Sequence, residues 1–225
     1  MLPLPPLDEL RPRLPRLIGG LVLFGVGIAL MVRADLGLAP WDVLHQGVAE
    51  GTGLAIGTVT ILTGVVVLLL WLPIRERPGL GTVLNVLVIG LVVDATLAVV
   101  PAPDALWVRV AFLAGGIFMF GPGSGLYIGS GLGPGPRDGL MTGLARRGRS
   151  VRAVRTAIEL TALAVGAALG GSIGVGTLAF ALTVGPNAQL TLFQHPRAYG
   201  ARRDCQESDV EGPPGAISHG LCDAR

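Results

Sequence analysis

The sequence LGLAPWDVLHQGVA at residues 36–49 returns as LGPGPRDGLMTGLA at residues 132–145, each time between long apolar runs. The same offset of 96 residues continues upstream and aligns Gly19, Gly20, Phe24, Gly25, Gly27 and Leu30 with Gly115, Gly116, Phe120, Gly121, Gly123 and Leu126. Downstream, an offset of 95 aligns Gly79, Gly81, Thr82, Leu87 and Gly90 with Gly174, Gly176, Thr177, Leu182 and Gly185. One apolar unit is therefore present twice, a pattern typical of many transporter folds.

The composition is that of an integral membrane protein. Apolar residues make up 51% of the chain and charged residues 14%, and the mean hydropathy is +0.65. A helix needs ~20 residues to cross a hydrocarbon core of ~30 Å. Apolar runs of about this length cover residues 17–32, 56–72, 80–100, 108–128, 154–169 and 175–193. We therefore predict an all-α, polytopic membrane protein with about six spans.

Outside the spans the chain changes character. Residues 1–16 are rich in proline and charge and are expected to form a short cytoplasmic lead-in, followed by the integral membrane domain at residues 17–193. Residues 194–225 lose apolar periodicity and are predicted to form a disordered cytoplasmic tail. Two cysteines and two histidines lie near or in this tail, but their spacing fits no standard zinc pattern, so no metal site is predicted.

Arginine placement predicts the orientation of the chain in the membrane. All seventeen basic residues are arginines. They cluster at Arg11, Arg13 and Arg16, at Arg75 and Arg77, at Arg137, Arg146, Arg147, Arg149 and Arg152, and at Arg197, Arg202 and Arg203. Cytoplasmic segments are enriched in basic residues. Six spans place every one of these clusters and both termini inside, and leave Arg33 and Arg109 at the outer boundary.

An odd number of spans in each copy implies that the second copy is upside down relative to the first. Residues 17–100 and 108–193 are therefore predicted to form a three-plus-three inverted repeat. The repeated motif segments are expected to be short broken or re-entrant helices after the first and fourth spans. Trp41 suits an outer interface and its counterpart Arg137 suits the cytoplasmic side.

The motif L-G-x-x-P-x-D admits two interpretations. Proline is well tolerated in a first helical turn, and an aspartate two residues later can accept orphan backbone N–H groups there, so a cap alone would explain the motif. The second interpretation places both helix starts near the middle of the bilayer around a cavity. The residues that would form and pack these starts are Gly37, Pro40, Gly133 and Pro136.

In the second interpretation Asp42 and Asp138 face each other and form an ion- or substrate-binding site. Two carboxylates in one low-dielectric cavity cannot both stay ionised cheaply, so one would bind a proton or a cation. His45 could add a titratable group, although a lone histidine is more often an ordinary hydrogen-bonded residue. Arg137 is the natural counter-ion of Asp138, and an anionic substrate would prefer Arg137 and the free helix starts.

Two acidic residues inside the apolar runs are further candidates. Glu159 follows Arg155 by four residues on one helix face, which fits either a buried ion pair or a role in substrate or proton binding. Asp94 has no partner nearby in the sequence and either lines a polar cleft or reaches toward the interface.

Known catalytic and cofactor-binding motifs are missing from the sequence. It contains no phosphate-binding glycine loop with lysine, no HExxH and no serine nucleophile elbow. We therefore expect neither an enzyme nor a cofactor.

The chain resembles the YczE/YyaS/YitT family of bacterial integral membrane proteins, most closely its YczE-like branch. The resemblance rests on GLGPGPRDGLMTGLARR (131–147), LGLAPWDVLHQG (36–47), TGLAIGTV (52–59), RPGLGTVLN (77–85) and SVRAVRTAIEL (150–160), and it extends over roughly residues 17–193. It implies a small multi-span protein of the inner membrane and assigns no substrate.

The expected function is that of a small secondary transporter or channel-like carrier of unknown substrate. The alternative is a membrane anchor or assembly partner that does not transport. Such a protein would use the basic loop, whose residues Arg146, Arg147, Arg149 and Arg152 also suit anionic lipid headgroups.

Overall fold

The computed structural model describes residues 6–145 and 150–192, which are entirely α-helical in their regular structure. The helices are α1 (Leu7–Ala34), α2 (Pro40–Thr52), α3 (Ile56–Leu69), α4 (Trp71–Ile74), α5 (Leu80–Val99), α6 (Leu106–Gly129), α7 (Pro136–Ala145), α8 (Val151–Ala168) and α9 (Val175–Leu192). The predicted all-α class is confirmed.

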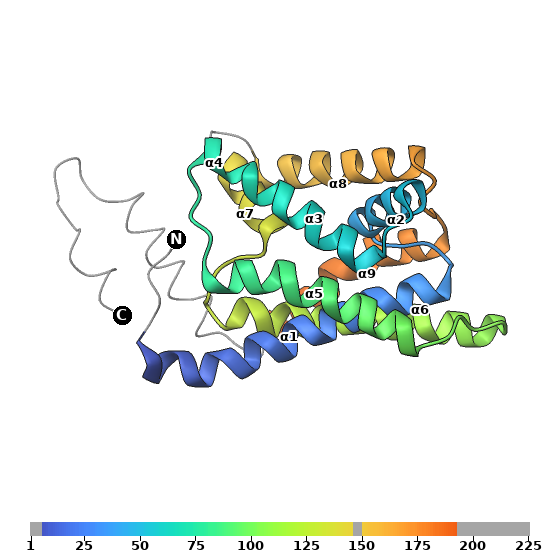
Figure 1. The fold of residues 1–225 in the computed structure, drawn as a ribbon, viewed down its shortest axis with the longest axis horizontal. Coiled ribbons are helices and arrows are strands. Elements are labelled where there is room, and N and C mark those ends of the chain that lie inside the picture. The colour runs from blue at the N-terminus through green and yellow to red at the C-terminus, as the bar shows by residue number, and fades with distance from the viewer. Residues whose placement is uncertain (1–5, 146–149, 193–225) are drawn as a thin grey trace.

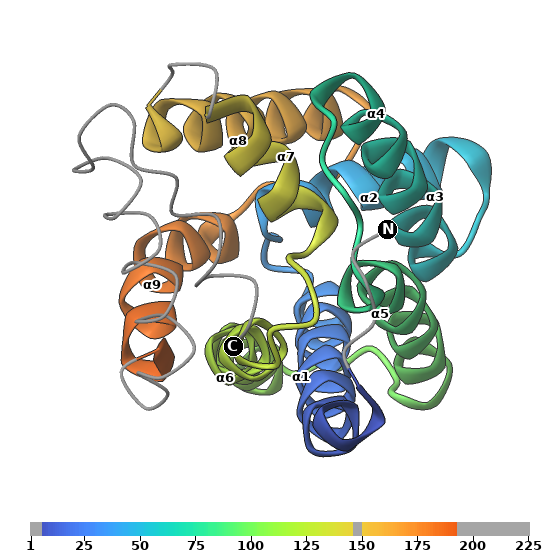
Figure 2. The same cartoon turned by 90° about the vertical axis from the view of Figure 1, so that its left-hand side faces the viewer.

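The two motif helices lie inside a ring of the longer ones. Seen end-on, α6, α1, α5, α3, α8 and α9 surround α2 and α7 (Figure 2). Helix α2 contacts α8 and α3, and α7 contacts α8, α3 and α4. Along the long axis α2 lies in one half of the bundle and α7 in the other (Figure 1). The short helices predicted after the first and fourth spans are therefore present and central.

Four stretches of the described chain are long and apolar enough to cross a membrane: α1, α3 together with α4, α5, and α6. Helices α8 and α9 are not among these four, although both form where spans were predicted. Exposed leucines lie on α3, α5, α8 and α9, with examples at Leu62, Leu91, Leu160, Leu178 and Leu182. The molecule thus presents an apolar surface that fits a lipid bilayer.

Helices α1 and α6, neighbours in the ring, pack closely against each other (Figure 2). Glycines make this approach possible, because a Cβ added to Gly20 would lie 2.7 Å from the carbonyl oxygen of Gly123, and one added to Gly27 would lie 3.0 Å from that of Gly116. The rings of Phe24 and Phe120 contact each other between these two glycine contacts, with centroids 4.5 Å apart and a tilt of 53°. Both helices therefore pack through the glycines that the two copies share.

A second pair of equivalent contacts connects each motif turn to a helix of the other copy. The amide of Gly81 donates to the carbonyl of Leu132 at 2.8 Å, and the amide of Gly176 donates to the carbonyl of Leu36 at 2.7 Å. The residues after these acceptors, Gly37 and Gly133, both have positive φ angles, of 109° and 125°. The start of α5 thus binds the turn that leads into α7, and the start of α9 binds the turn that leads into α2.

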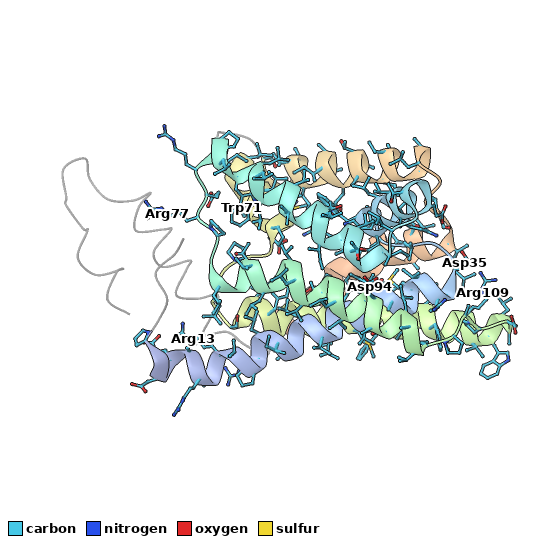
Figure 3. The ribbon with its side chains drawn as sticks, viewed as in Figure 1. Arg13, Asp35, Trp71, Arg77, Asp94 and Arg109 are labelled. Carbon is cyan, nitrogen blue, oxygen red and sulfur yellow. The ribbon has the colours of Figure 1, made fainter. Side chains whose placement is uncertain are left out.

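The two ends of the bundle carry different charged residues. Arg13 and Arg77 lie at one end, whereas Asp35 and Arg109 lie at the other (Figure 3). Arg109 donates to the carbonyl of Ala34 at 2.7 Å and binds the Asp35 carboxylate at 2.9 Å. This places a cation against the carbonyl end of α1, where the helix dipole favours it.

Two predicted segments differ from the structure or lie outside it. Helix α1 begins at Leu7, ten residues before the predicted span, and contains Pro12 and Pro15. Both prolines lie beyond the first turn, where each removes one backbone hydrogen bond, and the helix continues through them. The predicted tail at 194–225, with its cysteines, and the loop residues Arg146, Arg147 and Arg149 lie outside the described residues.

Candidate functional site

A cavity of about 210 Å³ lies where α2 and α7 begin. Pro40 and Pro136, the first residues of these helices, both line it, and aromatic rings including Phe24, Phe120 and Phe180 close its inner side. The polar side chains of the lining are His45, Thr60, Thr63, Asn85, Ser124, Tyr127, Arg137, Asp138, Arg155 and Glu159. The two motif segments are therefore brought to one polar cavity in an otherwise apolar bundle.

Asp42 is the most deeply buried charged group at this site, with 1% of its surface exposed. Its Oδ1 lies 3.4 Å from His45 Nδ1 and 3.8 Å from a guanidinium nitrogen of Arg137. Neither carboxylate oxygen has a hydrogen-bond partner among the described residues. Helix α2 begins without a side-chain cap, so Asp42 does not make the capping contact that would explain the motif by itself.

His45 connects Asp42 to α3. Its Nδ1 lies 3.2 Å from the hydroxyl oxygen of Thr60, which is itself 2.9 Å from the carbonyl of Ile56. The ring is 1% exposed and still lines the cavity. One imidazole therefore touches the buried carboxylate, a neighbouring helix and the cavity.

Asp138, the counterpart of Asp42, has different surroundings. It accepts a hydrogen bond from the hydroxyl of Tyr127 on α6. It lines the cavity, whereas Asp42 lies behind the lining. The two carboxylates occupy equivalent positions in the repeated sequence but are not equivalent in chemistry.

Arg137 belongs to the second copy and contacts two residues of the first, Trp41 and Asp42. Its guanidinium carbon is 4.8 Å from the centre of the Trp41 ring, which is a cation–π contact, and it approaches Asp42 only at 3.8 Å. No hydrogen bond from this guanidinium to another described residue is found, and 26% of the side chain is exposed. Its N–H donors are therefore available to a molecule in the cavity.

Glu159 and Arg155 form a pair at the more exposed edge of the cavity. Arg155 Nε donates to Glu159 Oε1 at 2.9 Å, and the two side chains are 56% and 34% exposed. The predicted ion pair on one helix face is present. Both residues also line the cavity, so they form a polar edge of it.

Asp94 does not belong to the cavity. Its Oδ1 accepts from the amide of Gly57 at 2.7 Å, and its Oδ2 accepts from the hydroxyl of Thr58 at 3.2 Å. Asp94 of α5 thus accepts from one orphan backbone donor and one side-chain hydroxyl in the first turn of α3. The partner of Asp94 is therefore a helix start that is distant in sequence.

Sequence reasoning missed Tyr127 and Trp71. Trp71 is 2% exposed, and its Nε1 donates to the carbonyl of Pro136 at 3.0 Å, which holds the start of α7. Both residues carry a polar group inside an apolar run, and that was the available signal. Within residues 6–145 and 150–192, no group of three acidic, histidine or cysteine side chains is close enough together to hold a metal ion.

Comparisons with known proteins give relatives but no activity. A family of unknown function (DUF6198) matches residues 12–192. An "uncharacterized protein" of Haemophilus influenzae is 41% identical over 177 residues, which cover 78% of this chain and 81% of that protein. The "uncharacterized membrane protein YczE" of Bacillus subtilis is 33% identical over 74% of this chain and 79% of its own. "Uncharacterized protein YyaS" of the same organism is 27% identical over 71% and 82%. No solved structure matches.

Proposed function

The chain belongs to the DUF6198 family of bacterial membrane proteins, and we propose that it is a small secondary transporter or channel-like carrier whose central site is the cavity at the starts of α2 and α7. One observation carries this proposal. A bundle with a lipid-compatible exterior encloses a cavity lined by charged groups, with a fully buried carboxylate behind it that has no hydrogen-bond partner.

The free-energy cost of burying the Asp42 carboxylate supports a functional role for it. Burying a carboxylate without hydrogen bonds costs several kcal/mol even with a cation nearby. Ionisable groups inside a membrane protein mark ion or substrate paths by default. Arg137 supplies free donors in the same cavity, so the site has both a cation-seeking and an anion-seeking group.

We further propose that the two copies form an inverted repeat with six crossings. Support comes from contacts that each residue makes with its own counterpart, Phe24 with Phe120 and Trp41 with Arg137. Helices α1, α5 and α8 run in one direction and α3, α6 and α9 in the other (Figure 1). Discontinuous helices that meet at mid-membrane are typical of such carriers.

The proposed orientation puts the end with Arg13 and Arg77 in the cytoplasm, because basic residues are retained on that side (Figure 3). Asp35 and Arg109 then face outward. The protein would be a multi-pass component of the bacterial cytoplasmic membrane with both termini inside.

Access to the cavity tests the proposal without a known substrate. Ser124 and Thr63 line the cavity, so Ser124→Cys and Thr63→Cys are prepared in a chain whose Cys205 and Cys222 are replaced by serine. A charged, membrane-impermeant thiol reagent is applied to right-side-out and inverted vesicles. Leu91→Cys, at a side chain that is 62% exposed on the apolar exterior, is the control.

A carrier predicts that both cavity thiols react from at least one side and that the Leu91→Cys thiol, surrounded by lipid, does not. Reaction from each side in turn would fit alternating access. A cavity that is closed to the reagent from both sides would overturn the transport proposal and favour the anchor or assembly role. In that role the basic loop with Arg152 would bind anionic lipid.

A further inference from the structure

We propose that Asp42 is a proton-binding carboxyl and that His45 connects it to the cavity, so that the ion coupled to transport is a proton. The coupling of this proton to transport rests on the proposed function. Proton binding itself can be measured whether or not the protein is a carrier.

Space around Asp42 selects the proton over a metal cation. Both carboxylate oxygens are out of reach of solvent, and Asp42 is not part of the cavity lining. A bound sodium or calcium ion needs several oxygen ligands at about 2.3–2.6 Å around a volume of its own. A proton needs no volume, because it forms a bond to an oxygen that is already there. The described surroundings of Asp42 therefore leave room for a proton and not for a metal cation.

The hydrogen bonds of His45 fix the position of one ring proton. The hydroxyl of Thr60 has a single hydrogen, and it donates that hydrogen to the carbonyl of Ile56 at 2.9 Å. The contact of 3.2 Å between this hydroxyl and His45 Nδ1 must then have Nδ1–H as the donor. In the neutral ring Nε2 is consequently unprotonated and can accept a proton.

The ring can pass a proton to Asp42 with all atoms balanced. A proton from the cavity forms an N–H bond at Nε2, and the Nδ1–H bond is exchanged for an O–H bond on Asp42 Oδ1, 3.4 Å away. The imidazole ends neutral with its proton on Nε2, and the carboxyl ends neutral. The net change is one proton bound and no other bond altered.

The charged and titratable groups around this pair come from three other helices, α6, α7 and α8. Arg137 of α7 lies 3.8 Å from Asp42, and Asp138 beside it is engaged by Tyr127 of α6. Arg155 and Glu159 of α8 pair with each other at the edge of the cavity. On α3 the contact is the neutral Thr60. Of the two motif carboxylates, therefore, only Asp42 lacks a hydrogen-bond donor among these described groups.

Infrared spectroscopy of the purified protein in lipid bilayers tests the proposal. The carbonyl stretch of a protonated carboxyl is followed while pH is changed, first in choline and then in sodium buffers. We expect one such band to appear on acidification, to vanish in Asp42→Asn and to persist in Asp138→Asn. In His45→Phe, which removes the imidazole that connects Asp42 to the cavity, the band should appear more slowly after a drop in pH.

Several outcomes would overturn the inference. Absence of the band in the wild-type protein would exclude proton binding. A band that disappears in Asp138→Asn instead of Asp42→Asn would assign the proton to Asp138. A band that sodium suppresses would show that the site binds a metal cation. If Asp42→Asn does not fold, carbon-13 labelling of the aspartates in Asp138→Asn still decides whether an aspartate carries the band, and an unshifted band rejects it.

The thiol-access experiment separates this inference from the proposed function. If the cavity thiols react from both sides but the infrared band is absent, the carrier proposal stands and the proton-binding proposal falls. If the band behaves as expected but the cavity thiols never react, the proton-binding proposal stands and the transport proposal falls.

Discussion

Arg137 stacks on Trp41 at 4.8 Å, and these two residues occupy the same position of the repeated sequence, 96 residues apart. The contact therefore joins a residue to its own counterpart across the centre of the molecule. It also explains why the copies differ here, since two arginines would repel and a ring with a guanidinium attract. The charge that this places beside Asp42 gives the cavity its polarity.

Asp42→Asn is expected to leave the free energy of unfolding unchanged or to raise it by up to about 2 kcal/mol, because it removes a buried charge without breaking a hydrogen bond. Asp138→Asn should cost about 1–2 kcal/mol, because it weakens a charge-assisted bond from Tyr127. Thermal unfolding in one detergent compares the two. Equal losses would contradict the different surroundings of the two carboxylates.

The same two variants separate structure from transport once a transported solute is known. If Asp42 binds an ion, Asp42→Asn should abolish flux into reconstituted vesicles at an unchanged protein level, because the shape stays and the charge goes. Wild-type flux in Asp42→Asn and in Asp138→Asn would withdraw both residues as binding sites.

Gly20 and Gly19 form a matched pair for the contact between α1 and α6. A Cβ at Gly20 would lie 2.7 Å from the carbonyl oxygen of Gly123, whereas one at Gly19 meets nothing within 4 Å. Gly20→Ala should destabilise the protein by about 1–3 kcal/mol through overpacking. Gly19→Ala should be neutral or stabilising by up to about 1 kcal/mol. Chemical unfolding measures both, and a harmless Gly20→Ala would count against the contact.

Trp71 is expected to hold the start of α7. Trp71→Phe keeps most of the packing and removes the donor to the Pro136 carbonyl, which should cost about 1–2 kcal/mol. Trp71→Ala should cost about 3–5 kcal/mol, because it also leaves a cavity. Proteolysis near Pro136 should rise in the same order. Full stability of Trp71→Phe would show that the hydrogen bond contributes nothing.

Orientation is tested by thiols at the two ends. Glu50→Cys should react with an impermeant reagent added to intact cells, whereas Arg77→Cys should react only after the cells are opened, because the two lie on opposite sides in the proposed orientation. Cys205 and Cys222 are replaced by serine in both. The reverse pattern would mean that the orientation is opposite to the proposed one. Labelling of both thiols from outside would contradict the six-crossing arrangement.

Much of the helical layout followed from the sequence. The apolar runs correspond to α1, α3, α5, α6, α8 and α9, and the prolines of the motif mark the first residues of α2 and α7. Both signals are local, since a membrane span depends on the hydropathy of its own ~20 residues and proline acts on the turn that contains it.

The chemistry of the acidic residues was decided by tertiary structure. The sequence cannot tell that Asp94 caps α3, that Tyr127 engages Asp138, or that Asp42 has no hydrogen bond, because each depends on which helix lies opposite. Asp42 and Asp138 look alike in the repeated motif, yet one lies sealed beside a histidine and the other lines the cavity. A charge inside a membrane protein takes its role from its neighbours, and those neighbours come from distant parts of the chain.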